Sequence, residues 1–421
     1  MGGGLLQLVA YGAQDVYLTG NPQITFFKTI YKRHTNFSIE SVQQIFDGVC
    51  NFGRQLTCTI SRKGDLLSQM FLTFDLPAMP KGPNGEDISW CNSIGHYLIE
   101  SYELEIGGQL IDKQYGEWLE IWSELTLPAS KLDGYNNMVG KYDNVAFEND
   151  TQMGSLKLHV PLQFWFCRNV GLALPLVALQ YHEVKMLIKL RDFDKLYYSG
   201  DLAVKPVSTP DITSGYLYCD YVYLDTEERR RFAQNSHEYL IEQVQFSGTT
   251  SIGMNETEMN VPLILNHPVK EISWVIQSDK SYQYNTHGNY SWEGASAAQL
   301  LQHDTGLGTN EPALQDPLRE SKLQLNGIDR YSTRDGKYFR LVVPYQRHTR
   351  IPQSFVYTYS FALKPEEHQP SGTCNFSRID NAVLNLSIKG SATYSSRFRL
   401  YALNYNILRI MSGMGGVAYS N

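Results

Sequence analysis

Alternating apolar and polar positions recur along the chain and predict short β-strands. The segment FSIESVQQIF, residues 37–46, has the period of two that is typical of a half-buried strand. A similar string, LIEQVQF, follows at residues 240–246. The residues common to both strings are Ile39, Glu40, Val42 and Gln43 in the first and Ile241, Glu242, Val244 and Gln245 in the second.

Three further echoes occur in the same order. They are YELEIGG (102–108) with SKLQLNG (321–327), ALQYHEVKMLIK (178–189) with RIDNAVLNLSIK (378–389), and DYVYL (220–224) with NYNIL (404–408). In each pair the apolar residues alternate in step, so that they share one face of a strand. Four echoes in order predict that the chain contains two copies of one strand pattern.

The spacing between echoes changes in two places, which indicates inserted segments. The second copy is longer over residues 282–317, a stretch rich in Gly, Asn and Ser without a strand period, which we predict to be an exposed loop. The surplus of the first copy falls around residues 123–152. Long insertions in connecting loops cost little closure entropy, so a duplicated core can keep its strands while its loops diverge.

Two segments have helical character, and each precedes one of the matching IExVQ strands. They are FFKTIYKRH (26–34) and DTEERRRFAQ (225–234). In the second, Asp225 or Thr226 is placed as an N-cap, and acidic residues precede the arginines, as the helix dipole favours. We therefore place the boundary between the two copies near residues 225–236.

Each copy holds about eight runs of strand character separated by turn signals, a spacing that favours a sandwich or jelly roll. The absence of regular helices between the strands argues against a parallel α/β sheet. The composition agrees, because Tyr (28), Phe (18) and Gly (33) are abundant whereas charged residues make up only 19%. The predicted fold class is all-β, with short helices in connections.

The charge of the chain and its lack of targeting signals argue against a nucleic-acid-binding, secreted or membrane-spanning protein. A net charge of −7 gives no general attraction to nucleic acid, and no basic run is long enough to supply it locally. The six cysteines form no C-x-x-C pair, so we expect small apolar residues in a reducing compartment. The N-terminus lacks a secretory signal, and Pro175 interrupts the longest apolar run, at 170–179. We expect a soluble protein made in the cytosol.

Candidate chemistry is sparse, and we predict no catalytic residue, metal or cofactor. The two His-Glu pairs lack the second histidine of a zinc peptidase, and no phosphate-binding loop or nucleophile elbow is present. Asp192 and Asp194 could bind a cation or sugar nucleotide, and Glu40 with Glu242 could act as a hydrolytic pair. The simpler interpretation of Asp192 and Asp194 is a solvated loop. For Glu40 and Glu242, which occupy matched positions of the repeat, it is a role in the fold. A glycan-binding or glycan-cleaving protein remains the alternative.

Longer blocks carry a family resemblance. They are LVAYGAQDVYLTGNPQITFFKTIYKRHTNF near the N-terminus, GLALPLVALQYHEVK and LDTEERRRFAQNSHEYLIEQVQF in the centre, and LKPEEHQPSGTCNFSRIDNAVLNL with YNILRIMSGMGGVAYSN near the C-terminus. Together they resemble the major capsid proteins of nucleocytoplasmic large DNA viruses, nearest the algal-virus and giant-virus branch. The resemblance runs from about residue 5 to the C-terminus and is interrupted at 123–152 and 282–317.

This resemblance implies a double jelly roll, two eight-stranded antiparallel sandwiches in tandem. The implied divisions are an N-terminal arm (1–25), a first jelly roll (26–224), a linker helix (225–236), a second jelly roll (237–411) and a C-terminal tail (412–421). The linker helix and the repeat found above fit this plan. A minor capsid or penton protein, as an alternative, would usually contain a single jelly roll.

The resemblance also implies a function. Three chains would form a pseudo-hexagonal homotrimeric capsomer in the icosahedral shell of a double-stranded DNA virus, a structural role without enzymatic activity or cofactor. Neighbouring capsomers, minor capsid proteins and penton proteins would be the partners, with residues 1–25 near an inner membrane and no direct contact with nucleic acid. Assembly in the host cytoplasm would place the protein in the virion. Outer loops of some relatives carry glycans, and Asn289 in the long loop is the candidate position here.

Overall fold

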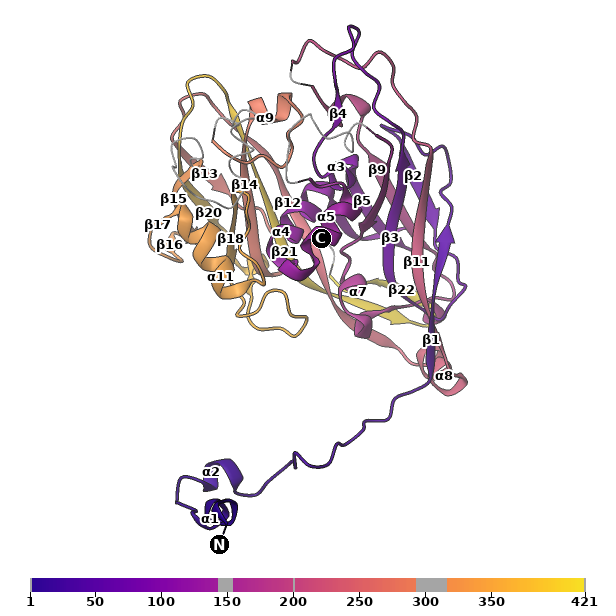
Figure 1. Ribbon diagram of the computed structural model, residues 1–421, viewed down its shortest axis with the longest axis vertical. Coiled ribbons are helices and arrows are strands. Elements are labelled where there is room, and N and C mark those ends of the chain that lie inside the picture. The colour runs from indigo at the N-terminus through magenta and orange to yellow at the C-terminus, as the bar shows by residue number, and fades with distance from the viewer. Residues whose placement is uncertain (1, 143–153, 200, 293–315, 420–421) are drawn as a thin grey trace. The chain divides into compact units, whose positions relative to one another are not determined.

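The computed structural model describes residues 2–142, 154–199, 201–292 and 316–419 (Figure 1). The chain divides into two compact units, Met1–Asn36 and Phe37–Asn421. The larger unit therefore starts at Phe37, not directly after the expected arm of residues 1–25. No helix among the described residues is long and apolar enough to span a membrane.

The N-terminal unit has two short helices and no buried side chain among its described residues. The helices are α1 (Gly3–Val9) and α2 (Val16–Thr19). The helix expected over residues 26–34 is wrong, because the backbone there is irregular. Its aromatic and β-branched residues are weak helix formers, and a helix this short is marginal unless it buries an apolar face. Phe26 and Phe27 are instead 89% and 98% exposed.

The first roll, which we define as residues 37–224, consists of two antiparallel sheets. One has the order β1 (Phe37–Gln44), β11 (Ser214–Leu224), β3 (Leu66–Leu76) and β7 (Leu156–Pro161), with β8 (Leu174–Pro175) paired to β3. The other has the order β2 (Gln55–Thr59), β9 (Val184–Leu190), β5 (Ile99–Ile106) and β6 (Gln109–Tyr115). A two-stranded ribbon joins β4 (Ser89–Trp90) to β10 (Tyr197–Tyr198).

The second roll, residues 237–417, repeats this plan. One sheet has the order β12 (His237–Ile252), β21 (Ser396–Met411), β14 (Pro268–Ser278) and β18 (Val356–Ser360), with β19 (Cys374–Asn375) on β14 and β22 (Met414–Val417) on β21. The other has the order β13 (Glu258–Pro262), β20 (Ala382–Ile388), β15 (Leu318–Leu325) and β16 (Ile328–Asp329), with β17 (Arg334–Asp335) on β15.

The wiring of the two rolls is the same. The order β1-β11-β3-β7 corresponds strand by strand to β12-β21-β14-β18, and β2-β9-β5-β6 corresponds to β13-β20-β15-β16. Within these two orders, successive strands alternate between the two sheets except at the β5–β6 and β15–β16 hairpins, which is the connectivity of a jelly roll. The predicted duplication is confirmed at the level of topology, and with it the double jelly roll.

The register of the echoes agrees with a common origin of the two rolls. Glu40 pairs with Tyr221 across β1 and β11, and its counterpart Glu242 pairs with Tyr405 across β12 and β21. The first and fourth echoes of the sequence therefore meet in space in the same way in both copies. Between β5 and β9 and between β15 and β20, the register differs by two residues. A shift of two keeps every side chain on its original face of the sheet.

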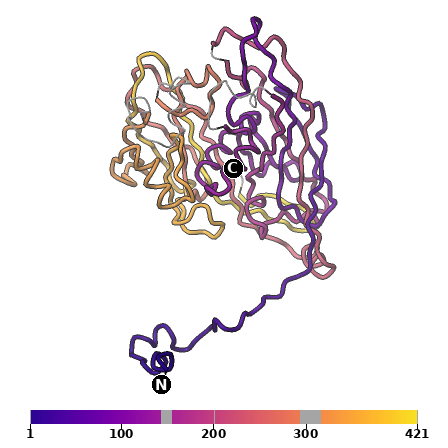
Figure 2. Tube along the Cα trace, viewed as in Figure 1, coloured from indigo at the N-terminus to yellow at the C-terminus, as the bar shows by residue number. Residues whose placement is uncertain are grey.

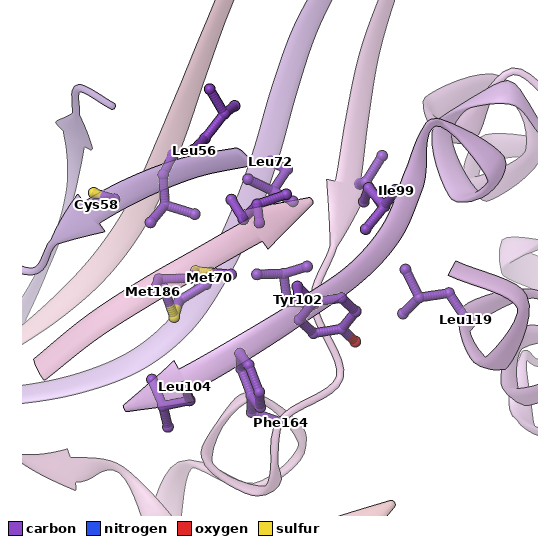
Figure 3. Close-up of a cluster of buried hydrophobic side chains, with 14 of the residues drawn as sticks. Leu56, Cys58, Met70, Leu72, Ile99, Tyr102, Leu104, Leu119, Phe164 and Met186 are labelled. Carbon is purple, nitrogen blue, oxygen red and sulfur yellow. The ribbon is translucent and has the colours of Figure 1, made fainter. Parts of the chain in front are cut away.

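Each roll has its own apolar core. In the first, side chains from β2, β3, β5 and β9 meet between the sheets, among them Leu56, Met70, Tyr102 and Met186, all at most 1% exposed (Figure 3). Alternation along each strand produces this arrangement, because every second residue faces inward. Burial of each such side chain stabilises the fold by about 1.5–3 kcal/mol relative to exposure.

Helices occupy the connections, as expected. Those of the larger unit are α3 (Ile94–Leu98), α4 (Gly116–Thr126), α5 (Leu132–Val139), α7 (Trp165–Arg168), α8 (Thr226–Gln234), α9 (Asp279–Gln283) and α11 (Val343–Arg347). Single turns of 3₁₀ helix cover Ala129–Lys131, Val170–Leu172, Leu176–Ala178, Phe193–Lys195 and Phe376–Arg378, and a π-helical turn covers Tyr338–Val342. The N-cap predicted for α8 is confirmed, since the Asp225 side chain accepts from the Glu228 N–H at 2.9 Å.

The C-terminal segment, which we expected to be a tail over residues 412–421, contains a strand. β22 pairs with the end of β21, and Figures 1 and 2 show these yellow strands crossing from the second roll toward the first. Leu408 and Ile410 of β21 belong to the core of the first roll. Gly415 lies so close to that roll that a Cβ on it would stand 2.6 Å from Leu179. The chain end therefore fastens one roll to the other.

Candidate functional site

The carboxylates that the sequence offered for hydrolysis or ligand binding do not converge. Glu40 is exposed on β1 and accepts a hydrogen bond from Tyr223 Oη at 3.1 Å. Glu242 is buried on β12, in the other roll. Asp192 and Asp194 are exposed around the 3₁₀ turn after β9. Within the described ranges no group of three or more His, Cys, Asp or Glu residues could hold a metal ion.

Glu242 instead joins the two rolls through a buried ion cluster. Its carboxylate accepts from Lys270 Nζ at 2.6 Å and from Arg168 Nη1 at 2.8 Å. Lys270 lies on β14 of the second roll, whereas Arg168 lies on α7 of the first and stacks on the Trp122 ring at 4.1 Å. Burial lowers the pKa of Lys270, and Glu242 opposes that shift. This matched position of the repeat therefore serves the junction between the rolls.

Helix α4 is the element that brings most buried charge to this junction. Its residues Trp118, Ile121, Trp122 and Leu125 pack in the core of the second roll, while Leu119 packs in the core of the first. A helix that serves two cores must be apolar on most of its surface, and its remaining polar side chains need partners where they are buried. The residues 123–152, predicted to be loop surplus, thus include the end of α4 and all of α5.

A signal for α4 was present in the sequence. The residues Trp118, Ile121, Trp122 and Leu125 are spaced i, i+3, i+4 and i+7, which is the apolar stripe of a helix. The length of the segment, 11 residues, is also typical of a helix and long for a strand. This period of 3.6 distinguishes the segment from the strands around it, in which the period is two.

The first charged cluster on α4 surrounds Glu117. Its carboxylate pairs with Arg399 Nη2 at 2.7 Å and accepts from Tyr401 Oη at 2.6 Å and from Tyr290 Oη at 3.1 Å. The three partners all belong to the second roll, and Tyr290 Oη also lies 3.3 Å from Tyr97 Oη of the first. A single carboxylate of the first roll therefore organises three buried polar side chains of the second.

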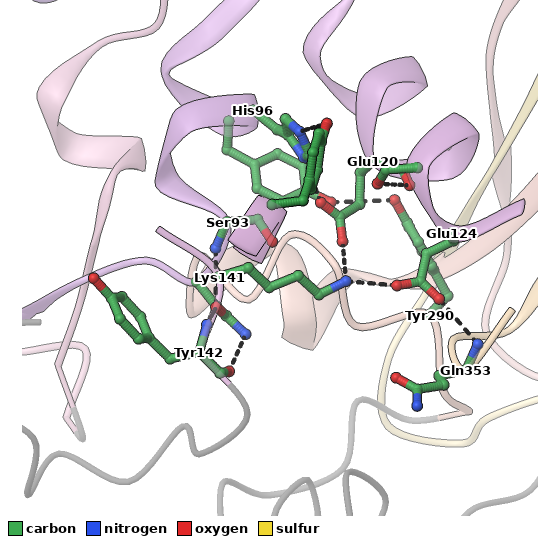
Figure 4. A network of polar contacts seen from close by, with 12 residues as sticks. Ser93, His96, Glu120, Glu124, Lys141, Tyr142, Tyr290 and Gln353 are labelled. Carbon is green, nitrogen blue, oxygen red and sulfur yellow. Dashed lines mark hydrogen bonds and ion pairs between the residues drawn. The ribbon is translucent and has the colours of Figure 1, made fainter. Parts of the chain in front are cut away.

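The second cluster lies one turn further along α4 (Figure 4). Lys141 Nζ is 2.7 Å from Glu120 Oε1 and 2.6 Å from Glu124 Oε1. Glu120 also binds His96 Nδ1 at 2.6 Å, and Glu124 also binds Arg350 of the second roll at 2.9 Å. Burial alone would raise the pKa of both carboxyls, but Lys141 and the other donors hold each pKa below its usual value. Both carboxylates are therefore charged and compensated inside the protein.

A third contact joins β6 to β12. Asp112 Oδ1 accepts from the Val244 N–H at 3.1 Å, and the Gln243 side chain donates to the carbonyl of Ile111. Burial raises the pKa of Asp112 to about 6, although Gln114 donates to this carboxyl and lowers the pKa in part. Buried charged and polar groups therefore find partners across the junction at four points, around Glu242, Glu117, Glu124 and Asp112, which favours a single arrangement of the two rolls.

The beginning of the segment predicted to be an exposed loop, residues 282–317, also docks at the junction. Asn285 Nδ2 donates to the carbonyls of Asp194 and Tyr197 at 2.9 and 2.8 Å. His287 Nε2 lies 2.7 Å from the Lys195 carbonyl, and burial lowers its pKa to about 3, so the ring is neutral. The prediction of exposure is wrong for residues 284–291, because Asn285 and His287 find partners in the first roll and the segment packs against it. Residues 293–315 lie outside the described residues.

Asn289, the candidate glycosylation position, is only 9% exposed. Its Oδ1 accepts from both the backbone N–H and the hydroxyl of Ser291, the third residue of the acceptor triplet. An exposed location for this residue is therefore wrong in the folded chain, and glycosylation itself stays a prediction that the burial disfavours.

We expect Asn289→Gln to leave the mass of any glycans on the chain unchanged, since a folded chain hides this amide. Intact-mass spectrometry of protein produced in the viral host cell measures it. Asn375→Gln, at an exposed N-x-S position, is the matched control. Loss of a sugar mass only in the Asn289 variant would contradict the expectation.

The comparisons with known proteins agree with this architecture. The family model described as "Major capsid protein N-terminus" matches residues 25–225, and the model "Large eukaryotic DNA virus major capsid protein" matches residues 228–416. The major capsid protein of Pyramimonas orientalis virus is 48% identical, and that of Paramecium bursaria Chlorella virus 1 is 44% identical. Both alignments cover 100% of this chain and 100% of the relative.

Solved structures of viral capsid proteins are also similar to this chain. A quasi-atomic model of the PBCV-1 virus capsid contains a chain that is 36% identical and superimposes with a TM-score of 0.79, covering 94% of this chain and 100% of that one. The Faustovirus major capsid protein, at 14% identity, has a TM-score of 0.75 over 95% of this chain and 94% of its own, which shows a common fold.

The relatives are named as structural proteins and not as enzymes. The two family models together match this chain over residues 25–225 and 228–416, the ranges that hold its two like-wired jelly rolls. The chain belongs to the major capsid proteins of large eukaryotic DNA viruses, and it is a structural subunit of the virion that assembles with neighbouring copies into a capsid shell.

Proposed function

We propose that three copies of this chain form a pseudo-hexagonal capsomer of an icosahedral shell. The observation that carries the proposal is the identical wiring of two jelly rolls within one compact unit. Three chains then present six similar units in a ring, and each chain contributes two. The different connections of the two rolls allow contacts within and between capsomers to differ.

The junction between the rolls supports this arrangement. A ring of six units keeps its shape only if the two rolls of each chain do not rotate against each other. Buried Glu117, Glu124 and Glu242 each form an ion pair with an arginine of the other roll. Rotation of one roll against the other would separate these charges or expose them to water. Breaking such a buried pair is costly, which makes one arrangement strongly favoured.

We also propose the division of the chain into rolls at residues 225–236, with the second roll ending near residue 411 and a short C-terminal segment beyond it. The matched family ranges, 25–225 and 228–416, support this division. For the arm, the expected end at residue 25 is best moved toward Asn36, since the compact unit starts at Phe37.

The remaining partners are proposed from family membership. Minor capsid and penton proteins would bind the edges of the capsomer, and the arm would lie toward an inner membrane or these minor proteins. In the arm, Leu8, Tyr17 and Leu18 are 77–92% exposed, which leaves apolar surface for such a partner. Assembly would take place in the host cytoplasm, without direct contact with DNA. Glycans, where present, would be attached to outer loops.

Purified full-length protein is expected to have three times the chain mass of 48.0 kDa in mass photometry at micromolar concentration and below. A capsomer that forms before the shell assembles must bury a large surface between its three chains, so the trimer is expected to persist on dilution. A stable monomer, or a dimer as the largest species, would contradict the proposal.

A further inference from the structure

A histidine in the second roll is buried between two carboxylates that come from different elements. The side chain of His348, directly after α11, has 0% exposure. Its Nε2 lies 3.2 Å from Glu271 Oε2 on β14, and its Nδ1 lies 3.1 Å from Glu366 Oε1. Among the described residues His348 is the one basic side chain within ion-pair distance of Glu271, whose own exposure is 0%.

Glu366 lies in the middle of a loop that connects β18 to β19, here called the 361–373 loop. Besides His348, its carboxylate accepts from the Thr349 N–H at 2.7 Å and from the Thr349 hydroxyl. Elsewhere the loop bonds mainly to itself, as in the Leu363 N–H to Ser371 carbonyl bond at 3.2 Å, although the Phe361 and Ala362 N–H groups donate to the Lys270 carbonyl at its start. Leu363 is 62% exposed. The Glu366 contacts therefore provide much of what holds the middle of the loop in place.

The loop also borders the junction between the rolls. Glu366 and His368 line a small cavity of about 80 Å³ together with Arg168, Trp165 and Glu242. The same loop thus stands beside the ion cluster that joins α7 of the first roll to β12 and β14 of the second.

We propose that His348 is a pH-sensitive latch, which in its protonated form pins the 361–373 loop to β14 and releases the loop when alkaline conditions remove its proton. The latch works because one imidazolium bridges two carboxylates, with a hydrogen bond between Nδ1 and Glu366 and an ion pair between Nε2 and Glu271. The neutral ring keeps only one N–H, so it can serve only one of them. Since the Glu271 side chain is fully buried whereas that of Glu366 is 19% exposed, the remaining N–H stays with Glu271, and Glu366 is the carboxylate released to water with its loop.

The surrounding charges agree with a protonated ring at neutral pH. On β14, Lys270 faces Glu242, and on the loop Lys364 pairs with the exposed Glu367 at 2.8 Å. Arg347 of α11 donates to the Leu363 carbonyl at 3.2 Å, and Tyr405 of β21 is neutral because burial raises its pKa to about 12. No carboxylate other than Glu271 and Glu366 pairs with His348 among the described residues.

The direction of the pH dependence follows from these contacts. Burial alone would lower the pKa of His348, but Glu271 and then Glu366 raise it to about 9, above its ordinary value near 6.5. The stabilisation is therefore complete below about pH 6.5 and is lost as pH rises through about 9. Above that point the latched fraction falls roughly tenfold per pH unit.

Hydrogen–deuterium exchange of the assembled wild-type protein tests the latch. Between pH 7.5 and pH 10, exchange in the peptide that covers the 361–373 loop, divided by the rate of the unstructured peptide at the same pH, is expected to rise sharply near pH 9. At pH 7.5 Glu366→Gln is expected to raise exchange in the loop to the wild-type alkaline level and to abolish the pH step. The matched control, the double variant Lys364→Gln/Glu367→Gln, removes the exposed charges of the same loop and should behave as wild type.

A second measurement keeps the proposal testable if the Glu366 variant does not fold. Exchange of the imidazole Cε1 hydrogen, followed by mass spectrometry, reports the titration of His348 in the unmodified protein. A midpoint near pH 9 is expected. A midpoint near 6.5, or loop exchange that shows no step in the wild type, would overturn the latch.

Discussion

Replacement of Gly116 by alanine is expected to destabilise the folded chain by about 3 kcal/mol or more, the largest effect of any single methyl group that we can place. A Cβ on Gly116 would stand 2.1 Å from the carbonyl oxygens of both His96 and Ile99. These are backbone atoms of α3 and β5, so neither can turn away as a side chain would. The whole start of α4 would have to move.

The displacement would reach beyond α4 itself. Trp118 follows two residues later and lies in the core of the second roll, and Glu117 binds Arg399 there. A shift of the helix therefore pulls on both rolls at once. The free energy of unfolding, measured by guanidinium denaturation monitored by tryptophan fluorescence, is expected to fall accordingly.

Gly134→Ala provides the matched control. Gly134 lies inside α5, and nothing stands within 4 Å of the position of its Cβ. Alanine there should stabilise the chain by about 0.5–1 kcal/mol, because it reduces the freedom of the unfolded chain and favours the helix. Equal effects of the two substitutions would contradict the packing described for α4.

Lys141→Met is expected to destabilise the chain by about 3 kcal/mol, although it preserves the length and apolar stem of the side chain. The ammonium group is shared by Glu120 and Glu124, whose side chains are 5% and 2% exposed. Without it, two buried carboxylates keep His96 and Arg350 as their basic partners among the described residues, and Glu124 also keeps the Gln353 N–H at 2.9 Å. The unpaired charge, more than the lost bond, causes the damage.

The pH dependence gives this prediction a second readout. Lys141 helps to hold the pKa of Glu120 and of Glu124 below the ordinary value of 4.5. A depressed carboxyl pKa contributes stability above about pH 4.5 that is lost as pH falls. The difference between wild type and Lys141→Met should therefore shrink on acidification. Adding Glu120→Gln to Lys141→Met should recover part of the loss, which a double-mutant cycle measures.

Lys189→Met is the control for the general effect of removing a lysine. Lys189 pairs with Glu100 at 2.8 Å, but both side chains are about half exposed. Exposed pairs of this kind contribute at most about 1 kcal/mol. A loss as large as that of Lys141→Met would show that burial is not the cause.

The strands and the duplication could be predicted from the sequence because their signal is local and periodic. Glu40 and Glu242 stand in strings that match residue by residue, and the structure pairs them with the matching tyrosines Tyr221 and Tyr405. The helix over residues 26–34 could not be judged in the same way. Its aromatic and β-branched residues are weak helix formers, and no described surface of its own compact unit buries its apolar side chains.

The contacts at the junction between the rolls could not be predicted from the sequence. Its polar residues come from distant positions, as in the contact of Glu117 with Arg399, and each looks like an ordinary solvated charge in its own segment. The docking of Tyr290 and His287 could not be predicted either, because a stretch rich in Gly and Asn normally indicates an exposed loop. Of the elements at the junction, α4 could have been predicted from the sequence, because its apolar residues have helical spacing.

The claim on which this account depends is that one chain supplies two equivalent, rigidly joined units of a six-sided building block. Cryo-electron microscopy of the purified full-length protein tests it most directly. We expect a particle with threefold symmetry and six similar lobes, in which the two rolls of each chain keep the junction built on Glu117, Glu124 and Glu242. Particles with two or four lobes, or chains whose rolls vary in their relative orientation from particle to particle, would contradict it.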